Sequence, residues 1–494
     1  MKYQSTRGSA AVEASAAIVK GLAPDGGLYV PEAFPQIPQA ETLIPLSYKE
    51  RAKVILSAFL KDFTEEEVQI CVERAYTAEK FGSDEIAPMH KLTDKAHVLE
   101  LWHGPTCAFK DMALQILPHL LTVSMRKNGI QDEVVILVAT SGDTGKAALE
   151  GFRDVDGTKV LVFFPKDGVS NIQRKQMVTQ EGKNVGVAAV CGNFDDAQNG
   201  VKAIFTDADF GAFLKENGIV LSSANSINWG RLVPQIVYYV SSYVSLLEKG
   251  EIAKGESFNV VVPTGNFGNI LAAYYAKKMG VPVGKLICAS NANDVLTEFI
   301  GTGLYNRKRA FHLTASPSMD ILISSNLERF LYDITGKDAE KVRTWMEALK
   351  TEGSYRVDDA TLSQMQEILW AGACDDTKTM ETIKNTWETH GYLVDTHTAV
   401  ALRVYEDYVK ATGDDRKTVI ASTASPYKFG QSVLGALGEE VPEDDFGVLE
   451  KIEAVSGMPV PEALGGLRQK AERFKTETMP ENMPETVKTL LNIK

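Results

Sequence analysis

After about residue 95, the chain repeats one pattern: a short apolar run, a loop rich in Gly, Ser, Thr and Asn, and an amphipathic segment. Short apolar runs between such loops predict buried strands, and apolar positions three and four apart predict helices. This alternation predicts a mostly parallel sheet covered by helices, because parallel strands need connections of helix length. The predicted pairs are 98–101 with 107–123, 134–139 with 146–152, 160–164 with 171–180, 185–190 with 195–205, 219–221 with 232–247, 260–262 with 270–279, 286–289 with 294–301, and 418–421 with 429–437.

The number of predicted strands exceeds one comfortable open sheet, so we expect two α/β lobes. A (β/α) barrel is the alternative, which the charged helical insert at about 327–390 disfavours because it separates the last strand–helix pair from the others. We predict an N-terminal domain over 1–95, a first lobe over 96–250, and a second lobe over 251–494 that ends in a helix.

Composition and charge narrow the class of protein. The 494 residues are 44% hydrophobic and 24% charged, which is ordinary for a soluble globular chain. The net charge of −13 argues against nucleic acid as the main partner, although a local pocket can still bind a small anion. Five scattered cysteines without a CxxC pair predict neither a disulfide framework nor a metal site. The chain starts without a signal-peptide pattern and has no apolar run near about 18 residues, so we expect a cytoplasmic protein with no membrane partner.

The loop after the 260–262 strand is PTGNFGN, residues 263–269. Ligands of open α/β sheets bind at the carboxyl ends of the strands, where this loop lies. Its glycines permit close backbone approach, and the N–H groups of the following helix start suit a phosphate. A glycine-rich tight turn without a ligand has the same geometry, so this loop alone leaves both interpretations open.

The loop after the 134–139 strand is TSGDTGK, residues 140–146. It differs from a P-loop, because Thr140 stands where that motif needs Gly, and Ala147 stands where it needs Ser or Thr. Hydroxyl and backbone donors at a helix start remain, and these suit a carboxylate or a phosphate. An ordinary capped helix start is the alternative.

Lys110 follows the 98–101 strand in the segment HGPTCAFKD. We predict that Thr106 caps the next helix and that Lys110 lies in its first turn, where the helix dipole favours the neutral amine that a Schiff-base lysine requires. A solvated Lys-Asp pair is the ordinary alternative. We interpret His103 and Cys107 as structural residues.

Thr423 follows the 418–421 strand in the segment STASPYKF. Its hydroxyl lies just past the predicted strand end, where it could meet a ring nitrogen. A capping threonine is the alternative, and this loop by itself does not decide between them.

In their order along the chain, the four loops closely resemble the threonine synthase family, pyridoxal-phosphate (PLP) enzymes of the tryptophan-synthase-β fold type. HGPTCAFKD is similar to the family's cofactor-lysine segment, SGDTG to its substrate-carboxylate loop, and GNFGN to its cofactor-phosphate loop. The segments GLAPDGGLYVP, SANSINWGRLVPQIVYY and MDILISSNLER add to the resemblance. Two positions depart from the family pattern: Ser425 stands at a common His position, and Thr396 at a common Pro position.

The resemblance implies two fold-type-II lobes and a PLP enzyme that converts O-phospho-L-homoserine and water to L-threonine and phosphate by γ-elimination and β-addition. Lys110 would be the catalytic, cofactor-carrying lysine, and Thr423 would bond the cofactor ring nitrogen. The implied cofactor-phosphate ligands are Gly265, Asn266, Phe267, Gly268 and Asn269; the implied substrate-carboxylate ligands are Ser141, Gly142, Asp143 and Thr144.

The substrate phosphate needs a second anion site. Asn225 and Arg231 rank ahead of the other candidates, which are Ser226, Asn228, Arg174 and Lys175. The alternative for Arg231 is a helix-start residue paired with a nearby acid. The implied partner is the small substrate alone, with the chain a monomer or homodimer.

Two other functions stay open. A phospho-lyase or dehydratase of the same fold would keep Lys110 and the phosphate loop yet release a keto acid. A non-catalytic binding relative is the third possibility, and the intact Lys110, GNFGN loop and Thr423 argue against it.

Overall fold

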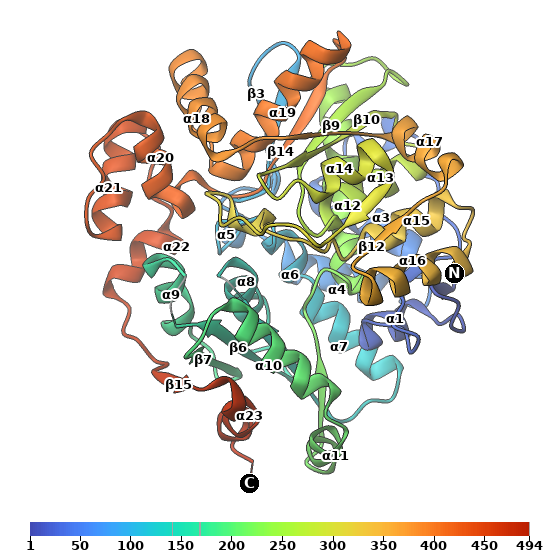
Figure 1. The fold of residues 1–494 in the computed structure, drawn as a ribbon, viewed down its shortest axis with the longest axis vertical. Coiled ribbons are helices and arrows are strands. Elements are labelled where there is room, and N and C mark those ends of the chain that lie inside the picture. The colour runs from blue at the N-terminus through green and yellow to red at the C-terminus, as the bar shows by residue number, and fades with distance from the viewer. Residues whose placement is uncertain (141, 167–168, 494) are drawn as a thin grey trace.

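The computed structural model describes residues 1–140, 142–166 and 169–493, and two mostly parallel sheets organise them (Figure 1). The large sheet has the strand order β13-β10-β9-β14-β4-β3, and the small sheet has the order β15-β7-β6-β5-β8. Every pair of neighbours is parallel except β3 with β4. The strands are β3 (Met89–Lys91), β4 (Ala96–Glu100), β5 (Glu133–Ala139), β6 (Thr158–Pro165), β7 (Val185–Val190), β8 (Ile219–Ser222), β9 (Phe258–Pro263), β10 (Val283–Ser290), β13 (Leu369–Ala373), β14 (Thr418–Ser422) and β15 (Thr476–Thr478).

Both faces of each sheet are buried, which explains why the strands are continuous apolar runs. In β9, Val260 and Val262 face one core, whereas Val261 faces another, as the two-residue period of a strand requires. Helices α12 and α13 pack on the first of these cores and α19 on the second. The predicted α/β fold with two lobes is therefore confirmed.

The helices follow the predicted segments closely, with one exception described below. The N-terminal region, which packs on α7 and α12, comprises β1 (Tyr3–Ser5), α1 (Ala14–Lys20), β2 (Tyr29–Pro31), α2 (Ala40–Leu43), α3 (Tyr48–Phe59), α4 (Glu65–Ala75) and α5 (Ala78–Phe81). The middle of the chain carries α6 (Asp111–Leu114), α7 (Leu117–Lys127), α8 (Asp143–Gly151), α9 (Asn171–Val178), α10 (Phe194–Thr206), α11 (Ala208–Glu216), α12 (Trp229–Glu248), α13 (Gly268–Lys278) and α14 (Val295–Thr302). The last part carries β11 (Leu304–Asn306), α15 (Leu327–Ile334), α16 (Ala339–Thr351), β12 (Ser354–Arg356), α17 (Asp359–Ile368), α18 (Asp376–His390), α19 (Thr396–Thr412), α20 (Gly430–Leu437), α21 (Asp445–Ser456), α22 (Glu462–Gly465) and α23 (Met483–Leu491).

The sheets do not follow the predicted division into residues 96–250 and 251–494. Strand β4, which leads to Lys110, pairs with β14 in the large sheet, and β15 near the chain end returns to pair with β7 in the small sheet. Figure 1 shows the C-terminal segment running from α20–α22 down to β15 and α23 beside the small sheet. Strand pairing joins segments far apart in sequence, so a linear boundary cannot describe these lobes.

The predicted helical insert at 327–390 contains two strands as well as helices: Ser354–Arg356 forms β12, which pairs antiparallel with β11, and the second strand is β13. Leu369–Ala373 forms β13, which extends the large sheet by pairing with β10. The segment is a short apolar run directly after α17, and periodicity alone does not separate such a run from a helix end.

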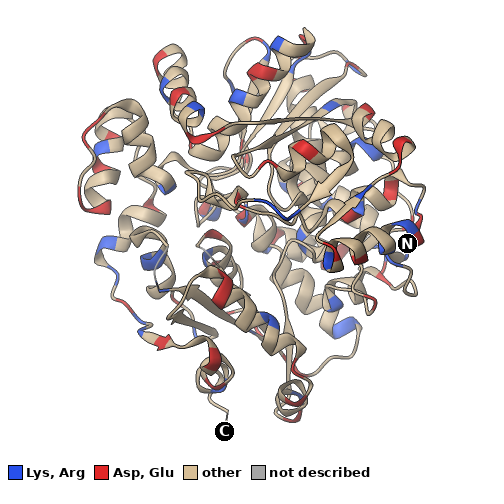
Figure 2. Ribbon diagram, in the orientation of Figure 1, with Lys and Arg blue, Asp and Glu red and all other residues tan. Residues whose placement is uncertain are grey.

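Charge is spread over many elements: acidic and basic residues are interspersed over the ribbon in Figure 2. Among the described residues, no helix combines the length and the apolar character that a membrane crossing requires. The described part of the chain also holds no cluster of three His, Cys, Asp or Glu side chains arranged to bind a metal ion.

Glu251 forms ion pairs at the edge of the large sheet where β4 and β14 begin, opposite the carboxyl ends of these strands. Its carboxylate lies 2.8 Å from Lys417 Nζ and 2.9 Å from Lys91 Nζ. Hydrogen bonds from these two lysines lower the pKa of Glu251 to about 2.

We expect Glu251→Gln to lower the thermal unfolding midpoint at neutral pH by a few degrees, corresponding to about 1–2 kcal/mol for partly exposed charged hydrogen bonds. Because the folded pKa lies below the ordinary value of 4.5, the stabilisation is complete above that pH and is lost as the pH falls through about 2. Unfolding midpoints across this range should therefore converge for wild type and variant in acid. A constant difference at every pH would contradict the assignment.

Candidate active site

The loops with candidate chemistry follow strands that are neighbours in space. In the large sheet β9, β14 and β4 lie side by side, and they are followed by the GNFGN loop, Thr423 and Lys110, respectively. The SGDTG loop follows β5 of the small sheet. The two sheets therefore bring all four loops to the carboxyl ends of their strands, where open α/β sheets bind ligands.

The lysine segment and the Thr423 segment are directly hydrogen-bonded. Phe109 N donates to Thr423 O at 2.8 Å, and Ser425 N donates to Cys107 O at 3.1 Å. The structure thus brings Thr423 to the residue directly before Lys110, although the two segments lie far apart in the sequence.

The prediction that Thr106 caps a helix starting at residue 107 is wrong. Cys107 has a left-handed backbone (φ 58°), which interrupts helical geometry, and α6 begins only after Lys110. Thr106 instead donates through both N and Oγ1, at 2.8 Å each, to the Asp111 carboxylate. Cys107 is buried, which raises the pKa of its thiol to about 12 and agrees with a packing role.

The Lys110 amine is buried between two lobes. Its Nζ donates to Ser318 Oγ at 3.3 Å and lies 3.8 Å from Asp143 Oδ2. Burial is the main cause that lowers the pKa of Lys110, so desolvation rather than the predicted helix dipole favours the neutral amine. Asp143 opposes this effect, whereas Arg231 and Lys428 add to it.

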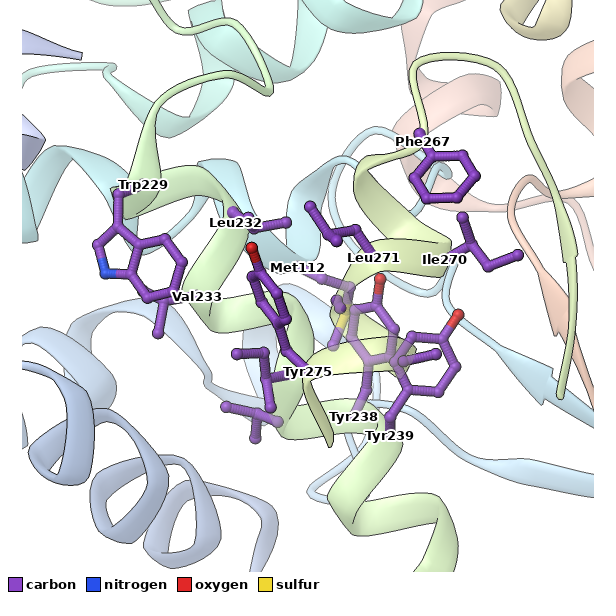
Figure 3. Packing of buried hydrophobic residues seen from close by; sticks show 14 of the residues in the cluster. Met112, Trp229, Leu232, Val233, Tyr238, Tyr239, Phe267, Ile270, Leu271 and Tyr275 are labelled. Atoms are coloured by element: carbon purple, nitrogen blue, oxygen red, sulfur yellow. The ribbon is translucent and has the colours of Figure 1, made fainter. Parts of the chain in front are cut away.

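The GNFGN loop has the features of an anion cradle. The backbone N–H groups of residues 265–270 donate to no group in the described part of the chain, and Phe267 adopts a left-handed backbone at the start of α13. Asn269 Oδ1 accepts hydrogen bonds from Tyr238 and Tyr239, whereas its buried Nδ2 has no partner among the described residues. Figure 3 shows these tyrosines packed between α12 and α13, with Phe267 at the end of the cluster.

The segment 318–326 packs against this cradle. A Cβ at Gly265 would lie only 2.9 Å from the Ser318 carbonyl oxygen, so glycine is required at this close approach. Ser324 Oγ donates to Gly265 O at 2.7 Å, and Asn326 N donates to Asn266 O at 3.0 Å. The unpaired N–H groups, the orphaned Asn269 amide and the glycine cradle fit a phosphate.

In the SGDTG loop, Ser141 lies outside the described residues. The N–H groups of Gly142 and Gly145 donate to Thr140 Oγ1 at 3.0 Å, and the half-buried Thr144 has no side-chain hydrogen bond to another described residue. Asp143 contributes a buried carboxylate that lies 2.9 Å from Lys428 Nζ and 3.0 Å from Gln173 Nε2. A negative side chain repels a substrate carboxylate, so any role of Asp143 in binding one would fall to its backbone.

Arg231 is a buried cation on α12. Its guanidinium donates to Ala224 O, and no carboxylate of the described residues forms an ion pair with it. Arg231 does lie in the first turn of α12, as the alternative supposes, but the pairing with an acid is not found within the described residues. Asn225, the other leading candidate, is exposed on the loop before α12.

The lower-ranked anion candidates have partners. Arg174 forms two hydrogen bonds to the Glu472 carboxylate, at 2.8 and 3.1 Å, on the surface. Lys175 lies over the Phe446 ring, 5.1 Å from its centre. Asn228 caps α12 and donates to Ile18 O, and Ser226 accepts from Asn326.

Sequence reasoning missed two residues that contact this site, Lys428 and Ser318. Lys428 stands in the STASPYKF segment after β14, and its position in a loop that was already singled out is the signal that could have found it. Ser318 lies before the MDILISSNLER segment, and its backbone N–H donates to His397 Nε2 at 3.2 Å. Only the folded chain places Ser318 beside Lys110.

The two departures from the family pattern lie in different settings. The Ser425 hydroxyl is fully buried and has no hydrogen-bond partner within the described residues. Thr396 is the first residue of α19, after the capping Asp395. Proline is common at that position because its N–H is not needed there, so Thr and Pro are both compatible with this helix start.

Three family models match the chain: "Threonine synthase N terminus" over residues 2–76, "Pyridoxal-phosphate dependent enzyme" over 87–424, and "Threonine synthase, C-terminal" over 398–491. The chain is 41% identical to threonine synthase-like 1 of Homo sapiens, over 90% of this chain and 61% of that protein. It is 40% identical to the threonine synthase of Pseudomonas aeruginosa, over 88% of this chain and 90% of that protein.

The chain thus spans about three fifths of the length of the threonine synthase-like 1 proteins. Among solved structures, PLP-bound threonine synthase from Brucella melitensis is similar with a TM-score of 0.88 and 37% identity, covering 99% of both chains. With one family model over more than half of its residues and a relative at 40% identity, the chain belongs to the threonine synthase family of pyridoxal-phosphate-dependent enzymes.

Proposed function

We propose that this chain is a lyase that converts O-phospho-L-homoserine and water to L-threonine and phosphate. The observation that carries the proposal is the buried Lys110 amine: it bonds Ser318, whose carbonyl oxygen lies against Gly265 of the cradle, and its charge is influenced by the buried Arg231, which has no ion-pair partner among the described residues. The cradle suits a cofactor phosphate and Arg231 suits the phosphate of a substrate; they belong to α13 and α12, which pack against each other beside the large sheet.

The residues of the large sheet would hold the cofactor. The N–H groups of residues 265–269 would bind its phosphate, Lys110 would carry it, and the Thr423 hydroxyl would bond its ring nitrogen. A neutral hydroxyl at that position, unlike a carboxylate, does not force the ring nitrogen into its charged form. Bound PLP supplies a sink for the electrons that remain when Cα loses its proton.

The remaining steps fall to the side chains of this chain. The Lys110 amine, whose pKa is lowered by burial, would accept the protons lost from Cα and Cβ of the substrate and return protons at Cγ and Cα. Gly142, Thr144 and the backbone of Asp143 would bind the substrate carboxylate. Arg231 and Asn225 would hold the phosphate that leaves from Cγ, after which the hydroxyl of water adds at Cβ.

The proposal also covers the cellular location, the partners and the oligomeric state of the chain. All five cysteines are free and four are buried, which is compatible with a reducing cytoplasm. We propose that the chain acts there on a small molecule, without nucleic acid or membrane, as a monomer or homodimer.

The test is to incubate the purified holoenzyme with O-phospho-L-homoserine and to quantify phosphate, threonine and keto acid. Equal amounts of phosphate and threonine are expected. Phosphate with keto acid in place of threonine would assign the chain to the same-fold phospho-lyases, and no phosphate release would contradict both functions.

A further inference from the structure

Lys428 is a fully buried lysine that connects the two lobes at the site. It lies in the short 3₁₀ segment Pro426–Phe429, which follows β14 of the large sheet, and its side chain is 0% exposed. Its Nζ is 2.9 Å from Asp143 Oδ1 and 2.8 Å from Gln176 Oε1. Both partners belong to helices beside the small sheet, α8 and α9, so one side chain from the large sheet joins two elements of the other lobe.

The Asp143 carboxylate is shared between two amines. Its Oδ1 faces Lys428 and accepts from Gln173, whereas its Oδ2 lies 3.8 Å from Lys110 Nζ. Buried ion pairs contribute little net stability, because desolvating the charges offsets their attraction. The second oxygen of the Asp143 carboxylate faces the Lys110 amine. The Lys428–Asp143 ion pair therefore suggests a role in the chemistry of the site rather than in folding.

Four charged groups act on Lys110 from the elements around it. Asp143 and Asp111 raise the pKa of Lys110, whereas Arg231 and Lys428 lower it, in addition to the lowering by burial. Asp111 is itself buried and bonded to Thr106, and burial raises its pKa to about 7. Asp143 is thus the main negative charge beside the Lys110 amine, and Lys428 is the cation in direct contact with Asp143.

We propose that Lys428 is a positioning residue that acts through Asp143: its ammonium holds the Asp143 carboxylate across the two lobes and balances its charge beside the Lys110 amine. Without the Lys428 ammonium, the negative charge of Asp143 is no longer balanced. It then stabilises the protonated form of the Lys110 amine. A protonated lysine neither attacks a carbonyl nor accepts a proton. The inference rests on the proposed function only in taking Lys110 as the cofactor-carrying lysine.

The test compares wild type, Lys428→Met, Asp143→Asn and the double variant as holoenzymes. The absorbance of the lysine-bound cofactor changes with protonation of the Lys110 nitrogen, so a pH titration gives a midpoint for each protein. We expect Lys428→Met to raise the midpoint by about one to three pH units, because an uncompensated carboxylate a few ångströms from an amine shifts its pKa by about that much. In the Asp143→Asn background, the same substitution should raise it by less than half as much.

Lys146→Met is the matched control. Lys146 is also a buried lysine of the small lobe, ion-paired with Glu150 at 3.0 Å, but it does not contact Asp143. Its loss should leave the midpoint unchanged, although it removes a buried ion pair as Lys428→Met does. If Lys428→Met folds poorly, Lys428→Gln removes the charge while keeping a hydrogen-bond donor, and the same comparison applies.

An unmoved midpoint in Lys428→Met and Lys428→Gln would overturn the inference. Equal shifts in the two Asp143 backgrounds would also overturn it, because Lys428 would then act on Lys110 without Asp143. A wild-type protein with no lysine-bound absorbance contradicts the proposed function itself, which keeps the two failures distinguishable.

Discussion

Lys110→Ala is expected to lower kcat by at least about 10³-fold and to remove the absorbance of the lysine-bound cofactor. The substitution deletes the amine that carries the cofactor and moves the substrate protons, and a positioned acid–base group alone contributes about 10²–10⁴-fold. No other lysine of the described residues takes its place near Ser318, because Lys428 is held by Asp143 and Gln176.

The measurements are steady-state kinetics with O-phospho-L-homoserine and an absorbance spectrum of the purified variant. Cofactor can still bind the GNFGN cradle through its phosphate, so retained but unlinked cofactor fits the assignment. Lys146→Ala, at a buried lysine outside the site, should keep both activity and spectrum. A Lys110→Ala protein with an unchanged spectrum would refute the role of Lys110.

Arg231→Met is expected to lower kcat/KM for the phosphorylated substrate by about 10²–10³-fold, chiefly through a higher KM. The loss of a buried charge that pairs with a ligand anion costs about 2–5 kcal/mol, whereas a rim charge costs little. Since burial lowers the pKa of Arg231 to about 10, its guanidinium is still charged at neutral pH and can bind an anion.

Arg174→Met is the matched control, because Arg174 is paired with Glu472 on the surface and was a candidate for the same role. Its substitution should leave KM unchanged. Stability separates a binding role from a structural one: removing a buried cation that has no ion-pair partner in the described part of the chain should leave the unfolding midpoint of Arg231→Met the same or higher. A large loss of stability with an unchanged KM would instead show that Arg231 supports the fold.

The strands and helices were predictable because both sheets are covered on both faces. Complete burial makes each strand an apolar run, and the loops between runs carry the residues that end helices and strands. The predicted 185–190 strand coincides with β7, and the other predicted strands differ from the observed ones by a few residues at their ends. Strand β13 was missed, because a five-residue run becomes a strand only when β10 offers an edge to pair with.

The prediction of a helix from residue 107 was wrong because contacts with a distant segment change the backbone at Cys107. Cys107 adopts a left-handed backbone while its carbonyl accepts a hydrogen bond from Ser425 N, and Thr423 O binds the N–H of Phe109. Helical patterning in 107–123 could not reveal this, since the competing hydrogen bonds come from a segment that follows another strand.

The sequence by itself determined the strand–loop–helix units, the loops at their carboxyl ends, and the candidates Lys110, Gly265–Asn269 and Thr423. The units and their loops depend on local composition and periodicity, which neighbouring residues encode, whereas the three candidates were selected by the resemblance of the four loops to the threonine synthase family. The tertiary structure decided which strands share a sheet, that Arg231 has no carboxylate partner within the described ranges, and that Lys428 contacts Asp143 beside Lys110. These are contacts between segments far apart in the chain, and burial gives them their effect: the same charges in water would be screened and carry little energy.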